Sequence, residues 1–169
     1  EYMKDGKVFS EYRVRDALSG GDAEAAFGLR NLWTLGEGLK LGTGFERIHA
    51  LSGKGDAEST AITLGVEYTA NPLWKGTARL ELRDGVTSDS VLSTIGVASK
   101  LNRDWTFLGR NTFSLTRNKG TATGEILLDR FQAGVAYRET ESNEWSGLAR
   151  VEVKNEKDTT QPGIELKRS

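Results

Sequence analysis

Apolar and polar residues alternate along most of this chain, and this period of two limits the fold more than any other feature. In residues 61–69 one face carries Ile62, Leu64, Val66 and Tyr68, and the other carries Thr63, Gly65 and Glu67. The runs 74–83, 91–101 and 145–154 repeat the pattern, and charged side chains dominate one face of residues 74–83. Alternation of this kind is typical of β-strands whose two faces meet different surroundings.

The alternating runs are also long. We expect strands at 7–18, 23–35, 38–51, 59–70, 73–84, 89–101, 104–118, 124–139 and 144–155, with a short tenth strand near 163–168. Strands in soluble sheets usually have about five or six residues, whereas about ten residues tilted by about 45° are needed to cross a bilayer. Almost nothing is left for helix, so the prediction is a single all-β domain over residues 1–169.

The connections between these runs alternate in length. Residues 36–38, 70–72, 102–104 and 141–143 are tight turns, and residues 52–58, 85–88, 119–123 and 156–163 are mostly longer. Outer-membrane barrels have short periplasmic turns and longer external loops. The sequence therefore predicts an antiparallel up-and-down transmembrane β-barrel with about ten strands visible, either complete or part of a larger barrel.

The four tryptophans, Trp33, Trp74, Trp105 and Trp145, all lie beside the tight turns. Tryptophan prefers the headgroup level of a membrane, where its ring meets apolar groups and its N–H reaches water. We expect these residues to form a periplasmic aromatic girdle together with Tyr68 and Tyr137, with Phe9 as a further candidate. The alternative, four core tryptophans of a soluble sandwich, does not explain the one-sided placement.

Charged residues of both signs gather at the opposite parity, on the face expected to line the lumen. They are Arg13, Arg15, Arg30, Glu46, Glu67, Arg79, Glu81, Arg83, Arg110, Arg130, Arg138, Arg150 and Glu152. In a narrow barrel of eight to ten strands such side chains pair and fill the interior. In a wider barrel they would line water and favour anions, because arginine outnumbers glutamate.

Composition excludes several classes of protein. The 23 Lys and Arg residues nearly balance the 24 Asp and Glu residues, which makes a nucleic-acid binder improbable on electrostatic grounds. The chain has no cysteine for disulfides, thiolate zinc sites or iron–sulfur clusters. The sequence contains no run of about eighteen apolar residues, which is the length that a membrane-spanning helix requires. No signal peptide opens the chain.

The sequence contains no clear pattern of catalytic residues. His49 is the single histidine and lies near Ser52, Asp56 and Glu58 at an expected external loop, but proximity in a loop is no evidence of a nucleophile with its base. No phosphate loop, metal cluster or spaced carboxylate pair stands out. We therefore expect no enzyme activity, no cofactor and no metal. Arg47, near the same end, is a better candidate to meet lipopolysaccharide phosphate.

Three segments resemble a known group of proteins: Phe27–Trp33, Leu64–Arg79, and Asp129–Tyr137 followed by Leu148–Glu152. They look like the barrel region at the C-terminal end of very large Gram-negative surface proteins with repeated extracellular domains. The resemblance implies a location in the outer membrane and a structural anchor for, or exporter of, a surface-exposed region. It also implies contact with outer-membrane lipid, lipopolysaccharide and the barrel-assembly machinery.

The last residues, 163–169, depart from that group because they lack a terminal aromatic residue and are too short to span a membrane. We therefore expect the barrel to be incomplete at the C-terminus. Two alternatives stay open: a porin-like channel with an Arg/Glu-lined lumen, and a soluble lipid-binding barrel.

Overall fold

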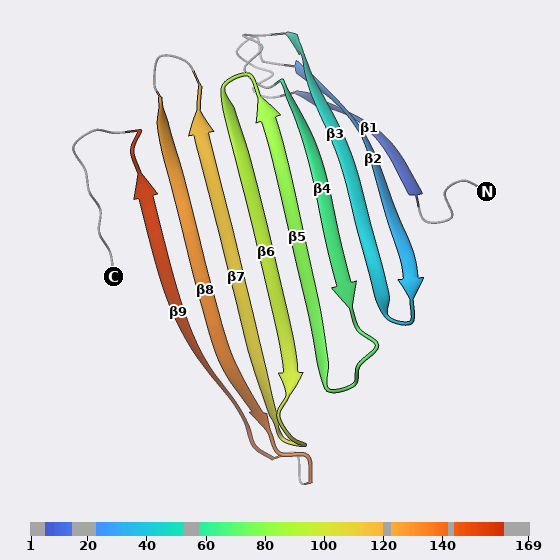
Figure 1. Ribbon diagram of the computed structural model, residues 1–169, viewed down its shortest axis with the longest axis vertical. Coiled ribbons are helices and arrows are strands. Elements are labelled where there is room, and N and C mark those ends of the chain that lie inside the picture. Colours follow the sequence, from blue (N-terminus) through green and yellow to red (C-terminus); the bar gives the residue numbers. More distant parts are fainter. Residues whose placement is uncertain (1–5, 15–22, 53–57, 120–122, 142–143, 161–169) are drawn as a thin grey trace.

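In the computed structural model, the described residues form one antiparallel sheet of nine strands that follow one another in sequence order (Figure 1). The structure describes residues 6–14, 23–52, 58–119, 123–141 and 144–160. The strands are β1 (Gly6–Val14), β2 (Ala23–Gly36), β3 (Leu39–Ser52), β4 (Ser59–Tyr68), β5 (Trp74–Gly85), β6 (Ser88–Lys100), β7 (Trp105–Asn118), β8 (Gly124–Arg138) and β9 (Ser146–Asp158). The prediction of an all-β, antiparallel, up-and-down fold is confirmed.

The strand boundaries agree closely with the expected ranges except near the chain's ends. β9 continues to Asp158, three residues past the expected end at 155. Outward apolar alternation stops after Val153, but backbone pairing goes on, with Leu128 opposite Glu156 and Ile126 opposite Asp158. The predicted tenth strand at 163–168, and residues 15–18 of the first predicted strand, lie outside the described residues.

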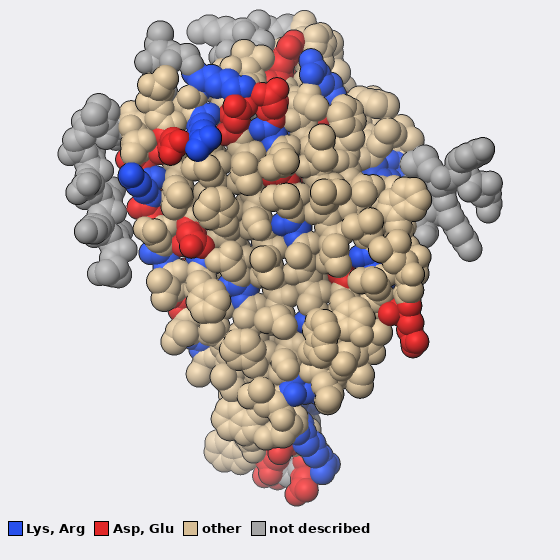
Figure 2. Space-filling model, viewed as in Figure 1, with Lys and Arg blue, Asp and Glu red and all other residues tan. Residues whose placement is uncertain are grey.

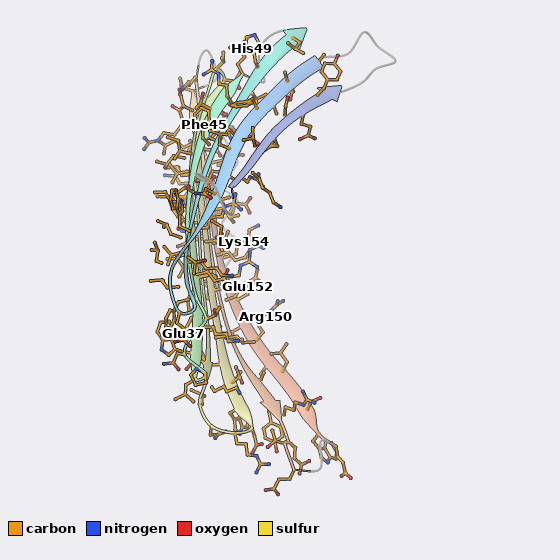
Figure 3. All side chains as sticks on the ribbon, turned by 90° about the vertical axis from the view of Figure 1, so that its right-hand side faces the viewer. Glu37, Phe45, His49, Arg150, Glu152 and Lys154 are labelled. Atoms are coloured by element: carbon orange, nitrogen blue, oxygen red, sulfur yellow. The ribbon has the colours of Figure 1, made fainter. Side chains whose placement is uncertain are left out.

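The sheet is strongly curved and open. It bends into a trough with a convex and a concave side, and Phe45 points to the convex side while Arg150, Glu152 and Lys154 point to the concave side (Figure 3). In the described part of the chain β1 and β9 are the two edges, each paired on one side only. The sheet therefore has the shape of a barrel wall that is not closed.

The register keeps the two faces separate across the sheet. Trp33, Leu41, Val66, Ala78 and Ile95 are successive partners on β2 to β6, and all have the outward parity. Directly opposed residues in an antiparallel ladder share a face. The alternation seen within each strand thus becomes one continuous convex apolar surface.

The described residues contain almost no apolar core. Ala23, Ala26, Ile48 and Ala61 are its buried hydrophobic members, while the large apolar side chains are exposed and mostly convex, as Ile62 (52%) and Phe131 (49%) are. On the convex face, charged side chains gather at the upper, loop end, and the middle is largely uncharged (Figure 2). Among the described residues there is no helix of the length and apolarity required to cross a membrane.

Side chains in the tight turns fix where the next strand begins. The Asn71 Oδ1 accepts a hydrogen bond from the Leu73 N–H at 2.8 Å, immediately before Trp74. The Asn102 Oδ1 accepts from the N–H groups of Asp104 and Trp105 at 3.0 and 2.9 Å. These Asx turns hold two tryptophans at the starts of β5 and β7.

The turn between β2 and β3 gives a direct test of backbone geometry. Gly38 has a φ of +64°, and a Cβ there would lie 2.2 Å from the Ala70 backbone nitrogen, whereas a Cβ at Gly36 meets nothing within 4 Å. We expect Gly38→Ala to lower the free energy of unfolding by about 1–2 kcal/mol or more. Gly36→Ala should change it by less than about 0.5 kcal/mol. Urea unfolding of the detergent-folded protein measures both, and equal losses would contradict this turn geometry.

Candidate functional site

Aromatic side chains meet at the turn end of the sheet. The rings of Tyr68 and Trp74 have centroids 4.6 Å apart, and those of Trp105 and Tyr137 are 4.9 Å apart. Trp33 lies on β2, two strands from Tyr68, and its Nε1–H donates to the Thr43 Oγ1 at 3.3 Å. Trp145 precedes β9 and is 72% exposed. All six residues predicted for the girdle therefore lie at the turn end; a girdle in a membrane stays a prediction.

Phe9, the further candidate, is not part of this group, so that expectation is wrong. It has concave parity, because it is opposite Gly28 in the β1–β2 ladder. Its ring covers Gly28, where an added Cβ would lie 2.2 Å from the Phe9 Cζ, and the Arg30 guanidinium stands 5.2 Å above the ring centroid. The missing side chain at Gly28 makes room for the ring. Strand parity could have indicated the concave facing of Phe9, but not its pairing with Gly28.

Charged groups bound the convex apolar surface at the loop end. The Lys119 Nζ contacts carboxylate oxygens of Asp84 at 2.7 Å and Asp89 at 2.5 Å. The hydrogen bonds to Asp84 and Asp89 hold the pKa of Lys119 above its ordinary value of 10.5. Arg117 pairs with Glu125 at 2.8 Å beside this cluster. These residues form no recognisable motif in the sequence. Asp84 and Arg117 follow the last outward apolar residue of their strands, and Asp89 and Glu125 precede the first one of theirs.

One polar pair lies on the convex face below that boundary. The Asn111 Nδ2 donates to the Asp129 Oδ1 at 2.8 Å, between β7 and β8. Both residues have the outward parity, since Asn111 is opposite Phe131 and Asp129 is opposite Phe113. Each side chain thus satisfies part of the other's hydrogen-bonding capacity on an otherwise apolar surface.

The concave face holds a chain of ion pairs centred on Arg83. Its Nη2 contacts Glu46 at 2.9 Å and Glu81 at 3.2 Å, and its Nη1 donates to the Ser59 Oγ at 3.1 Å. Arg79 contacts the other oxygen of Glu81 at 2.9 Å. Glu46, Glu81 and Arg83 are largely covered, with 17%, 18% and 29% of their side chains exposed. The network links β3, β4 and β5.

A second set of contacts joins β8 and β9. The Glu152 carboxylate accepts a hydrogen bond from the Gln132 Nε2 at 2.6 Å and lies 3.5 Å from the Arg130 Nε. Six of the predicted lumen residues therefore fall into two clusters, one of Glu46, Arg79, Glu81 and Arg83 and one of Arg130 and Glu152. Arg15 lies outside the described residues. Glu67, Arg110 and Arg150 form no ion pair with any described residue, and Arg138 lies on the same face near the end of β8.

The loop-end candidates for chemistry make simple contacts. The His49 Nδ1 lies 3.0 Å from the Glu58 Oε1, and the His49 side chain is 61% exposed. Asp56 lies outside the described residues. The Arg47 Nη1 donates to the Thr60 Oγ1 at 2.7 Å. Among the residues that the structure describes, no three His, Cys, Asp or Glu side chains are grouped to hold a metal ion.

Comparisons with known proteins give one solved structure. The chain is similar to the beta domain of the Bordetella autotransporter BrkA, with 14% sequence identity, a TM-score of 0.38, and coverage of 90% of this chain and 79% of that chain. No family model matches the sequence. The search of curated proteins gives no match either.

The Arg83 network predicts an unequal effect of two similar substitutions. Arg83→Gln leaves two largely covered carboxylates without their shared cation, so we expect a loss of about 2 kcal/mol in the free energy of unfolding. Arg79→Gln removes one contact of a side chain that is 57% exposed, and should cost less than about 0.5–1 kcal/mol. Urea titration followed by tryptophan fluorescence measures both variants. A larger loss for Arg79→Gln would mean that Arg83 does not organise this face.

Proposed function

We propose that this chain forms most of a β-barrel in the outer membrane of a Gram-negative bacterium, and that the barrel serves as a structural anchor for, or an exporter of, a surface-exposed region. One observation carries the membrane placement. The convex face is apolar and exposed, and it is bounded by Trp and Tyr at the turn end and by charges at the loop end.

The near absence of a buried core supports lipid as the surroundings of this face. A soluble domain of this size would bury a large fraction of its apolar surface. Here Phe27, Leu64 and Val151 are 48%, 48% and 66% exposed. A continuous exposed apolar surface needs a partner or a membrane to cover it. Lipid covers such a surface on every strand at once.

The height of the apolar band fits a bilayer. On β5 the outward residues run from Trp74 to the charged Asp84, with Ala78 and Leu80 between them. This stretch of about ten residues is about 33 Å long. With the usual tilt of about 40° it spans about 25 Å, the height of the apolar band in outer-membrane barrels.

The polarity of the two faces distinguishes the alternatives. A soluble lipid carrier needs an apolar interior and a polar exterior, and this sheet has the reverse arrangement. A porin-like channel would share the same wall. We favour the anchor over the channel because Arg79 and Arg83 of β5 pair with Glu81 and with Glu46 of β3, and paired charges of this kind serve to fill an interior.

The turn end and the loop end of the convex face also indicate how the proposed barrel is oriented in the outer membrane. With the tight turns in the periplasm, the loop end faces outward, as in other outer-membrane barrels. Arg47 and Lys119 then lie at the level of lipopolysaccharide phosphates, and Arg47 is the stronger candidate contact because its guanidinium matches a phosphate. Insertion would depend on the barrel-assembly machinery.

The proposal is tested by placing the same new charge on either face. Leu64→Arg puts a cation on the convex face near the middle of β4, where it should destabilise the membrane-embedded state by about 2–4 kcal/mol. Thr77→Arg is the matched control, because Thr77 is exposed on the neighbouring strand, has concave parity and is opposite Glu67. The measurement is the urea midpoint of protein folded into phospholipid vesicles. Equal effects, or a greater loss for Thr77→Arg, would contradict a lipid-facing convex surface.

A further inference from the structure

The concave face has an open groove over β1 to β5, on the turn side of the Arg83 network. Its volume is about 820 Å³, within the range of small-ligand sites. Four cations line it, Lys7, Arg30, Lys40 and Arg79, against one carboxylate, Glu67. The groove is therefore strongly positive, although the whole chain carries a formal net charge of −1.

Three of the four cations have no carboxylate partner among the residues that the structure describes. Arg79 is engaged by Glu81 at 2.9 Å, whereas Lys7, Arg30 and Lys40 form no ion pair with any described residue. Lys40 is directly opposite Glu67 in the β3–β4 ladder, but the two side chains do not form an ion pair. Arg30 is held in place over the Phe9 ring. Unpaired cations on a concave surface attract anions more strongly than those on an open one.

The floor of the groove is bare because of its glycines. Gly42 and Gly65 are opposite each other and have the concave parity, and Gly44 lies beside them. A Cβ at Gly42 or Gly65 would be in ordinary contact, at 3.8 and 3.6 Å from the nearest atoms. Tight packing therefore does not require glycine at these two positions. Their effect is to leave backbone surface open between the cations.

The same combination recurs farther along the sheet. A second groove of about 440 Å³ is lined by Lys75, Arg110 and Arg150 over Gly96 and Gly134, and none of the described carboxylates lines it. None of these three cations forms an ion pair with a described residue. Glycines and unpaired cations thus occur together twice on the turn side of the concave face.

We propose that the groove over β1 to β5 binds a small multivalent oxyanion, with Lys7, Arg30 and Lys40 as its ligands. Guanidinium and ammonium groups recognise both phosphate and carboxylate oxygens, so the two chemistries share the site. The anion enters from the turn end, which is the periplasmic end under the proposed function. The inference rests on the proposed function, because that function places the groove inside a barrel.

The test is isothermal titration calorimetry on the folded chain in an uncharged detergent at low salt, with inorganic pyrophosphate and citrate as separate probes. Saturable binding of either probe is expected. Lys40→Gln and Arg30→Gln should each weaken it about fivefold. The matched control is Lys154→Gln, a concave-face cation that is ion-paired with Glu156 at 2.5 Å and does not line the groove. It should leave the affinity unchanged.

A fourth variant distinguishes loss of the anion site from misfolding as the cause of weaker binding. Glu67→Gln removes the one carboxylate of the groove and should tighten binding severalfold, which a damaged protein would not do. No saturable binding of either probe, or equal weakening by all three cation variants, would overturn the site. Vesicle insertion of the unaltered chain is measured in parallel, so loss of anion binding with insertion intact contradicts this inference alone. A greater response to pyrophosphate than to citrate would assign the site to phosphate.

Discussion

The register of the backbone ladder is the constraint on which the rest of this structure depends. Because side chains alternate with a period of two, a slip of one residue between neighbouring strands would move a whole apolar set to the other face. The pairing of Val66 with Ala78, and of Ala78 with Ile95, prevents this. One apolar face and one charged face follow from the same pairing, as do the aromatic row at the turn end and the ion pairs at the loop end. The arrangement of side chains on the two faces therefore follows from the pairing of the strands and does not depend on a second layer of structure.

The backbone N–H and C=O groups that fix the register are paired on one side only at the two edge strands, β1 and β9. β1 and β9 run in the same direction, since every strand of the sheet is antiparallel to its neighbour and both are odd-numbered. Joining them directly would require a parallel pair, and bacterial outer-membrane barrels close with an even number of antiparallel strands. Unpaired N–H and C=O groups are not tolerated in hydrocarbon. A barrel closed by pairing β1 with β9 directly would therefore differ from those barrels.

Most of the fold was predictable because its signal is local. Residues 59–70, 73–84 and 89–101 alternate so regularly that parity alone fixes the facing of Leu64, Arg79 and Ile95, and turn residues such as Asn102 mark the ends. The side-chain contacts on the concave face were harder to predict from the sequence, because they depend on which strands are neighbours and on how far each side chain extends across them. Arg83 contacts Glu46 two strands away, and no spacing in the sequence shows that. Phe9 was misassigned because aromatic character was given more weight than parity, and Lys40 was overlooked because a lone lysine in a strand gives no pattern.

The depth of the four tryptophans tests the central claim most directly. Trp33, Trp74, Trp105 and Trp145 are kept one at a time, with the others changed to Phe, in vesicles that contain lipids brominated at defined depths. If the convex face meets lipid and the turns share one side, each tryptophan should be quenched most by bromines near the headgroups and least by those at the bilayer centre. The four depth profiles should coincide, and a quencher added to the opposite leaflet should have no effect. Maximal quenching of two tryptophans at mid-bilayer, or from opposite leaflets, would contradict the account.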